Sequence, residues 1–340
     1  MTTRRRLLLC ALLCATCAPA AAAGAAGPPL PSSASGRAGA VAPGGTERLL
    51  TQRAGEDTVV TAVHRGDRRV LRSRQINGRW SVPPVTVDGA TTGLSADGRV
   101  LVLARPERYL PPTSTELAVL DARRLLVRRR ISLPGFFTVD AISPDGRWLY
   151  LIQYAGQNVL DYRVRALDTL TGRLAARDVV DPREPDEQMG GLPMARVMSR
   201  DGRFAYTLYS GGRENFIHAL DTVRRSAACI DLAELPPGSD LSGFRLDLSA
   251  DGRQVRVLSA GSVLSTVNAR TGALSERGAA AATQPEALDA PRRVVAHSSD
   301  EAGFLWLPLT LVAGLAGLTT LAVAIARRRG RRGATAATGS

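Results

Sequence analysis

Two short sequence phrases recur four times each in this chain and keep a nearly constant spacing. The aspartates of the first phrase, Ser-x-Asp-Gly-Arg, are separated by 48, 56 and 50 residues and are Asp97, Asp145, Asp201 and Asp251. A copy of the second phrase follows each copy of the first. The second phrase is centred on Asp121, Asp168, Asp221 and Asn268, which are separated by 47, 53 and 47 residues. Two phrases in step, with a period near 50 residues, indicate stacked supersecondary units.

Each unit is predicted to contain four antiparallel strands. In the unit around Asp145, a short apolar run over 139–142 precedes the Asp-Gly turn, and an aromatic and aliphatic run over 147–152 follows it. Asp-Gly between two such runs is a strong hairpin signal, because glycine accepts a positive φ and aspartate caps the turn amides. Strands over 162–167 and 173–180 complete the unit. Helical periodicity is missing from the pattern, so we predict an all-β antiparallel fold.

The best-matching unit resembles a known repeat. Ser143–Leu151 (Ser-Pro-Asp-Gly-Arg-Trp-Leu-Tyr-Leu) followed by Leu167–Gly172 (Leu-Asp-Thr-Leu-Thr-Gly) is similar to the YVTN-type β-propeller repeat, which is related to WD-repeat and TolB-like propellers. The resemblance extends over roughly residues 90–280. It implies a bacterial β-propeller of four-stranded blades and leaves the function open, because propellers serve as binding modules, scaffolds and enzymes.

The number of blades depends on the region upstream. Residues 46–88 lack the Ser-x-Asp-Gly-Arg phrase, but they are predicted to form four strands over 48–51, 58–63, 70–75 and 80–85. Asn77-Gly78 between the last two runs predicts a tight hairpin. The propeller is therefore expected over 46–280 with five blades, or with six if residues 292–297 supply strands that close the ring.

The N-terminal sequence predicts export. Arg4–Arg6 precede an apolar stretch over 7–15 and an alanine-rich segment that ends near Ala23. This order describes a secretory signal peptide over 1–23, for either general or twin-arginine export. Residues 24–45, rich in alanine, glycine and proline, predict a disordered linker.

The C-terminal sequence predicts a membrane anchor. Residues 281–303 are expected to form a stalk or a ring-closing strand, and Phe304–Ala326 is a run of 23 residues without a charge. A helix of that length spans about 34 Å, enough to cross a bilayer core of about 30 Å. Five arginines within the tail, 327–340, place the tail in the cytoplasm by the positive-inside rule. We therefore expect a single-pass cell-membrane protein with an extracytoplasmic propeller.

The charge of the exported part is modest. All 44 basic residues are arginine, and removing three in the signal and five in the tail leaves 36 against 31 acidic residues. A net charge of +5, spread along the sequence, does not favour a nucleic-acid partner.

Catalytic, metal and cofactor signatures are missing from the sequence. Cys229 would be the one cysteine left after signal removal, and its apolar neighbours favour a buried structural thiol. The histidines His64, His218 and His297 have no metal-ligand spacing, and His218 is expected to pack within a strand. The repeated aspartates are explained by turn capping. We therefore predict no catalytic residue, no cofactor and no metal ion.

A binding site is expected on one rim of the propeller. Because strands alternate in direction, the repeated turns share one rim, whereas the variable second-to-third loops and the blade-to-blade connections share the other. Phe136 and Phe137 are expected there as an exposed aromatic pair, beside the acidic insertion 181–194. The candidate binding residues are Arg108, Tyr109, Phe136, Phe137, Gln157, Asn158, Asp186, Glu187, Arg213, Glu214 and Asn215.

Two classes of function remain after this survey. The first is a binding or protein-interaction module at the bacterial cell surface, with a protein, peptide or envelope glycan as partner. The second is a propeller-fold enzyme, such as a hydrolase, lyase or quinone-dependent dehydrogenase, with its site at the central channel. The scarcity of histidines and the missing motifs favour the binding module.

Overall fold

The computed structural model describes residues 28–275, apart from 108–110, 155–159, 188 and 212. The predicted signal peptide, stalk, transmembrane helix and tail lie outside the described residues, as does the strand proposed over 292–297. Within the described part of the chain, no helix combines the length and apolar character needed to cross a membrane.

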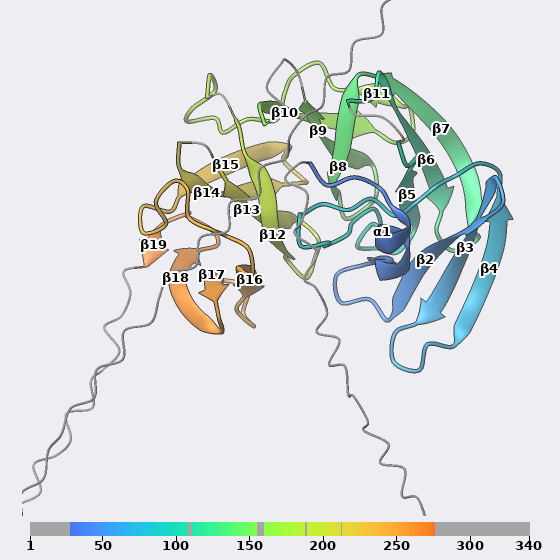
Figure 1. The fold of residues 1–340 in the computed structure, drawn as a ribbon, viewed down its shortest axis with the longest axis horizontal. Coiled ribbons are helices and arrows are strands. Elements are labelled where there is room, and N and C mark those ends of the chain that lie inside the picture. Colours follow the sequence, from blue (N-terminus) through green and yellow to red (C-terminus); the bar gives the residue numbers. More distant parts are fainter. Residues whose placement is uncertain (1–27, 108–110, 155–159, 188, 212, 276–340) are drawn as a thin grey trace, which may run out of the picture. The chain divides into compact units, whose positions relative to one another are not determined.

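Five antiparallel sheets, with strands in chain order, make up the described part (Figure 1). The first sheet consists of β1 (Ala40–Val41), β2 (Glu47–Ala54), β3 (Asp57–His64) and β4 (Val70–Ile76). The second consists of β5 (Val100–Ala104), β6 (Ser114–Asp121) and β7 (Leu126–Pro134). The third consists of β8 (Phe136–Ile142), β9 (Trp148–Tyr154), β10 (Tyr162–Asp168) and β11 (Arg173–Leu174). The fourth consists of β12 (Leu192–Met198), β13 (Phe204–Ser210), β14 (Asn215–Asp221) and β15 (Ser226–Asp231), and the fifth of β16 (Arg245–Leu248), β17 (Gln254–Ser259), β18 (Ser262–Asn268) and β19 (Leu274–Ser275).

The first repeated phrase forms the turn between the first two strands of the third, fourth and fifth sheets, and in the second sheet it forms the turn before β5, where Leu94 bridges to Leu101. Between β8 and β9, the Asp145 carboxylate accepts the Ser143 hydroxyl at 2.6 Å and the Arg147 amide at 3.0 Å. Gly146 supplies the positive φ of 74° that this turn requires. The same Ser–Asp contact recurs around Asp97, Asp201 and Asp251. The predicted structural role of the repeated aspartates is confirmed.

The second repeated phrase caps the turn before the outermost strand, and a salt bridge ties it to the first phrase. The Asp168 carboxylate accepts the Leu170 and Thr171 amides at 2.9 and 3.1 Å. It also accepts the Arg147 guanidinium of the preceding Asp-Gly-Arg turn at 2.5 Å. Arg203 and Asp221 repeat this pairing at 2.7 Å in the fourth sheet. Because the two turns contact each other within a sheet, the two phrases must recur with nearly the same spacing along the sequence.

Consecutive sheets pack face to face. Four hydrophobic clusters join the first sheet to the second, the second to the third, the third to the fourth and the fourth to the fifth. In β9, Leu149 and Leu151 belong to the second of these clusters, whereas Tyr150 and Ile152 belong to the third. A strand buried on both faces is what a propeller blade requires, and the antiparallel sheets therefore fit a propeller fold.

The start of the chain differs from the predicted linker over 24–45. Residues 33–38 form α1 (Ser33–Ala38), and β1 pairs with β2 through Ala40 and Leu49. Ala40 is fully buried, and a Cβ on Gly36 would lie 2.6 Å from the Thr51 hydroxyl. The small residues that suggested a linker are therefore needed here for close packing.

The predicted fourth strand of the first unit, residues 80–85, is not part of the first sheet. Because β1 is the first strand of that sheet, β4 is already the fourth, and Asn77-Gly78 begins the connection to the second sheet. Beyond it, Ser81 bridges to Ala104 at the end of β5. The hairpin predicted at Asn77-Gly78 is therefore wrong.

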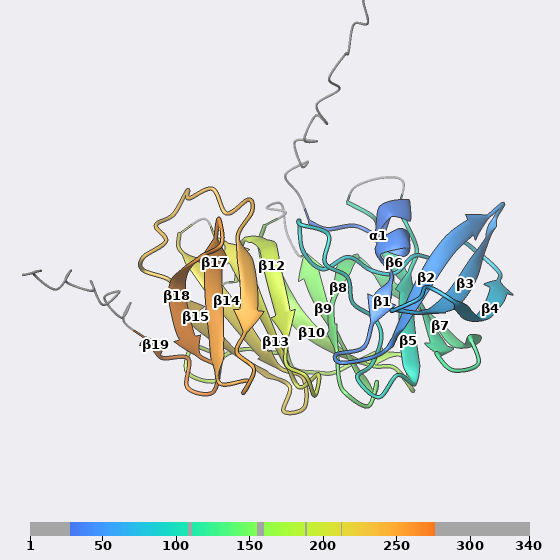
Figure 2. The same cartoon turned by 90° about the horizontal axis from the view of Figure 1, so that it is seen from below.

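Two rims follow from the strand directions. The variable rim carries the connections β2–β3, β5–β6, β9–β10, β13–β14 and β17–β18 together with the connections between sheets. The repeat rim, at the opposite strand ends, carries the Asp-Gly turns and the turns before the outermost strands. In Figure 2, α1 lies on the upper side, which is the variable rim, and the repeated turns lie on the lower side.

Candidate functional site

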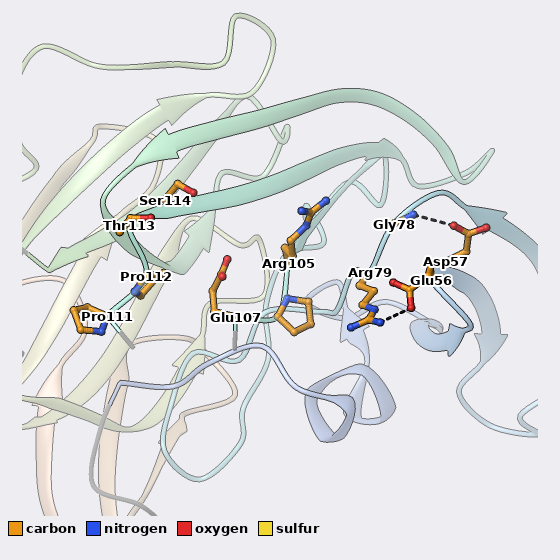
Figure 3. Close-up of a pocket in the computed structure, with 11 residues that line it drawn as sticks. Glu56, Asp57, Gly78, Arg79, Arg105, Glu107, Pro111, Pro112, Thr113 and Ser114 are labelled. Atoms are coloured by element: carbon orange, nitrogen blue, oxygen red, sulfur yellow. Dashed lines mark hydrogen bonds and ion pairs between the residues drawn. The ribbon is translucent and has the colours of Figure 1, made fainter. Parts of the chain in front are cut away.

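A pocket of about 700 Å³ opens on the variable rim of the first two sheets (Figure 3). Its walls come from the β2–β3 turn, the connection that follows β4, and the segment between β5 and β6. Its lining residues are Glu56, Asp57, Gly78, Arg79, Arg105, Pro106, Glu107, Pro111, Pro112, Thr113 and Ser114. The sequence predicts the β5–β6 segment on this rim with Arg108 and Tyr109 as its candidate residues, and both lie outside the described residues.

Ion pairs hold most charged side chains of the pocket in place. The Arg79 guanidinium contacts the Glu56 carboxylate, and Arg105 lies 3.1 Å from Glu116. The Asp57 carboxylate accepts the Gly78 amide at 3.1 Å, and this bond lowers the pKa of Asp57 together with a stronger one from Gln75. These four charged side chains of the pocket are therefore held by interactions within the protein.

Glu107 differs from these paired groups. Among the described residues, its carboxylate has no hydrogen-bond or salt-bridge partner, although Arg105 lies near enough to attract it. Partial burial raises the pKa of Glu107, because the charged form loses hydration without a full compensating contact. Figure 3 shows its side chain between Arg105 and the Pro111–Thr113 wall. A cationic group entering the pocket would supply the missing partner.

Phe136 and Phe137 are not the exposed pair that was predicted. They are 7% and 4% exposed, and the Phe136 ring stacks on Tyr154 with centroids 4.7 Å apart. Phe137 belongs to the cluster between the second and third sheets. Pro29–Pro31 line the same small cavity as both rings, so the start of the described chain lies over them. Burial removes the apolar area of both rings from water, so neither ring is available as an exposed binding surface.

Asn215 also has a structural role rather than an exposed one. It is fully buried, and its amide nitrogen donates to the carbonyls of Leu235 and Pro236 at 3.0 and 2.9 Å. It thereby holds the connection from β15 to β16 against the start of β14.

The remaining candidates fall into two groups. Asp186, Glu187, Arg213 and Glu214 are exposed on the variable rim, as predicted, whereas Gln157 and Asn158 lie outside the described residues. Asp181, in the same acidic insertion, is buried and pairs with Arg183 at 2.6 Å. The insertion is therefore anchored at its start and exposed further along.

A row of polar side chains crosses the interface between the third and fourth sheets. Asp140 of β8 forms a buried salt bridge with Arg196 of β12, whose Nε donates to the Thr207 hydroxyl at 3.0 Å. His218 pairs with Thr207 across the strands, and burial lowers its pKa to about 4. Neither ring nitrogen of His218 has a hydrogen-bond partner among the described residues. The predicted packed position of His218 is confirmed.

Cys229 continues this row on β15. It pairs with His218 across the strands and packs against the cluster between the two sheets. Burial raises the pKa of its thiol, and Glu187 raises it further. A thiol held in its protonated form is unreactive, which agrees with the structural role expected for Cys229. Within residues 28–275, leaving out the gaps at 108–110, 155–159, 188 and 212, no group of three or more His, Cys, Asp or Glu side chains is placed to hold a metal ion.

Glu56 and Arg79 of the pocket were not identified from the sequence. The first sheet lacks the repeated phrase, and the strand predicted as its first, 48–51, is β2, the second strand of the sheet. The sequence therefore does not assign the β2–β3 turn to the variable rim. Recognising β1 at Ala40–Val41 would have placed both residues correctly.

Comparisons with known proteins return distant structural similarities. No family model and no curated protein matches the chain. Similar solved structures include TolB from Acinetobacter baumannii, with 15% identity, a TM-score of 0.41, and coverage of 70% of this chain and 54% of TolB. A functionally unknown protein from Desulfotomaculum acetoxidans has 18% identity and a TM-score of 0.43, with coverage of 68% of this chain and 65% of that protein. The Myceliophteria thermophila Cps50 (Swd1) β-propeller domain has 12% identity and a TM-score of 0.39, with coverage of 69% of this chain and 63% of that domain. The chain thus spans less than two thirds of each. We draw no functional conclusion from similarities of this size.

Proposed function

We propose that this chain is an exported five-bladed β-propeller, held at the outer face of a bacterial membrane by one C-terminal helix, which binds a protein, peptide or envelope glycan through its variable rim. The observation that carries the binding role is the 700 Å³ pocket with the Glu107 carboxylate on its wall. The cell-surface location is supported by the sequence of 1–23 and by the uncharged run Phe304–Ala326 with the arginines that follow it.

The pocket suits a segment that presents a basic group beside a small apolar group. Glu107 would pair with the basic group, and Pro106, Pro111 and Pro112 form rigid apolar walls beside it. The Arg79–Glu56 and Arg105–Glu116 salt bridges orient the charged side chains beside these walls before the partner arrives, which limits the entropic cost of binding. The Glu107 carboxylate, which has no hydrogen-bond or salt-bridge partner among the described residues, is therefore a suitable recognition group for a basic ligand.

The enzyme alternative draws less support from the described residues. The titratable side chains Asp140 and His218 gather between two sheets, but Asp140 is 2% exposed and His218 is fully buried. A substrate would have to reach these groups through packed side chains. We therefore favour the binding module.

A cross-linking experiment in intact cells tests the binding role. A photo-cross-linking amino acid at Thr113, inside the pocket, is expected to capture a discrete partner, and Glu107→Gln in the same chain is expected to reduce the yield. The matched control carries the cross-linker at Ser73, which is exposed on β4 away from the pocket. Equal capture at both positions, or capture unaffected by Glu107→Gln, would contradict the proposal.

A truncation tests the location independently. Ending the chain before Phe304 is expected to release the propeller into the medium, because the proposed anchor is removed. Retention of the truncated chain in the membrane would refute the single-span topology.

A further inference from the structure

Exposed aliphatic side chains gather on the repeat rim. Seven large hydrophobic residues in the described part of the chain are exposed, and five of them lie at the turns that lead into the outermost strands β4, β7, β11, β15 and β19. Each sheet contributes one, with exposed fractions between 40% and 59%: Val70, Leu126, Leu170, Val223 and Leu274. We call these five turns, residues 65–70, 122–126, 169–173, 222–225 and 269–274, the outer turns.

Packing does not account for these aliphatic residues. Leu125, next to Leu126, is 1% exposed and belongs to the cluster between the first two sheets. Leu71, next to Val70, packs against the same cluster. Val70 and Leu126 themselves belong to none of the four clusters. A polar residue at either position would leave the described core unchanged.

The outer turns are also strongly basic. They expose one aspartate, Asp67, and nine arginines, which are Arg65, Arg68, Arg69, Arg123, Arg124, Arg173, Arg224, Arg225 and Arg270. The aspartates that cap these turns, such as Asp168 and Asp221, are buried and already paired with Arg147 and Arg203. The sequence suggested that the positive charge is spread evenly along the chain. In the structure it is concentrated on the outer turns.

Backbone geometry shows that the positive-φ position of these turns does not require arginine. The last turn residue has a positive φ in each sheet, and it is glycine in the third and fifth, with φ of 74° at Gly172 and 72° at Gly272. In the first and fourth sheets the same position holds Arg68 and Arg225, with φ of 59° and 61°. A side chain is strained in this conformation, and glycine is not. Arginine is therefore present at a conformational cost. Arg225 recovers part of this cost, because its guanidinium lies 4.5 Å from the centroid of the Trp148 ring, whereas Arg68 forms no such contact among the described residues.

We propose that the outer turns dock on an anionic membrane surface, with the arginines pairing with lipid phosphates and the aliphatic side chains entering the headgroup region. Guanidinium groups match phosphate oxygens, and basic side chains beside exposed aliphatic ones are typical of surfaces that bind anionic bilayers. One partner chemistry fits all five sheets, which favours a uniform surface over a single protein.

The place where the described chain ends agrees with this docking. Ser275 follows the outer turn of the fifth sheet on the repeat rim, and residues 276–303 separate it from the run Phe304–Ala326. That a membrane is the anionic surface nearest to the outer turns rests on the proposed function. The affinity of the outer turns for anionic lipid does not rest on it.

Vesicle flotation tests the affinity. The full chain is placed in nanodiscs of phosphatidylcholine and mixed with separate vesicles, either of phosphatidylcholine alone or with phosphatidylglycerol replacing part of it. Binding is expected to the anionic vesicles only and to weaken as salt is added. The variant Val70→Ser/Arg123→Gln/Arg124→Gln/Leu126→Ser is expected to bind about tenfold more weakly, because two surface charges and two apolar contacts are lost.

A matched variant controls for loss of charge and apolar area in general. Val87→Ser/Val263→Ser/Arg177→Gln/Arg245→Gln removes the same side-chain types from exposed positions outside the outer turns, and binding within twofold of the unaltered chain is expected. Arg68→Gly separates binding from folding: it is expected to weaken vesicle binding while leaving the chain at least as stable.

Three results would overturn the inference. They are equal binding to neutral and anionic vesicles, equal loss in both quadruple variants, or binding to a soluble phosphate polymer such as a thymidine oligonucleotide without binding to anionic vesicles. If the chain proves soluble without detergent, the proposed span is wrong, and the same variants are then tested by direct vesicle sedimentation.

Discussion

The burial of His218 predicts an acid sensitivity that can be calculated. The pKa of His218 is about 4 in the folded chain, against an ordinary value of 6.5. The unfolded chain therefore takes up the proton first as pH falls, so stability is complete above pH 6.5 and declines toward pH 4. Linkage over this interval gives a loss of about 2 kcal/mol between pH 7.5 and pH 5.

The groups that face His218 fix the sign of this effect. Desolvation between the third and fourth sheets is the largest cause, and the Arg196 guanidinium opposes protonation further. Asp140 and Asp181 favour protonation but do not compensate for the burial. The Tyr209 ring lies edge-on at 6.2 Å, and Cys229 is the cross-strand neighbour. The attraction of these two carboxylates for an imidazolium is therefore outweighed by the loss of hydration, and the pKa of His218 stays lowered.

His218→Leu supplies the comparison. Leucine cannot titrate and removes two buried nitrogens that have no partner among the described residues. Urea unfolding of the full chain in detergent, at pH 7.5 and pH 5, is expected to show a fall in the free energy of unfolding that is about 2 kcal/mol larger for the unaltered chain than for the variant. The turn aspartates titrate below this interval, because their pKa values are lowered. Equal pH dependence in both proteins would refute the reasoning.

Three further predictions concern stability and are all measured by chemical unfolding. Phe137→Ala is expected to cost about 3 kcal/mol, because a buried ring is removed; a cost below 1 kcal/mol would mean that the ring is exposed after all. Gly146→Ala is expected to cost at least about 1 kcal/mol more than Gly98→Ala, since both have positive φ but only the Cβ at 146 would collide with Val100; equal costs would contradict that contact. Asp145→Ala is expected to cost about 1 kcal/mol through its lost turn cap, without affecting cross-linking at Thr113; lost cross-linking in a folded variant would reverse the assignment of the two rims.

The sequence predicted the repeating part of this fold well, because repetition makes each turn visible several times. Asp145 and Asp168 stand in phrases whose hydrogen bonds are local, so the residues themselves specify the turns. The first sheet was predicted less well. Its first strand pairs through two residues, Ala40 and Val41, which carry neither a turn phrase nor a β-branched run.

The binding rim was predicted in position but not in detail. Phe136 and Phe137 were expected to be exposed because they follow a glycine in a variable segment, and nothing local shows that Pro29–Pro31 lie over the same cavity, more than 100 residues away in sequence. The same limit applies to Glu56 and Glu107, which share one pocket through tertiary contact alone. Local patterns identify turns, whereas burial depends on distant segments.

The position of Pro29–Pro31 has a practical consequence for engineering this protein. These residues line a cavity together with Arg105, Glu107 and Pro112, which also line the candidate binding pocket. A tag or fluorescent domain fused directly ahead of Pro29 would therefore be tethered beside that pocket and is expected to hinder the access of a ligand. A fusion joined at Ser275 instead would begin beside the repeat rim, so the choice of junction decides which rim remains available to a reporter assay.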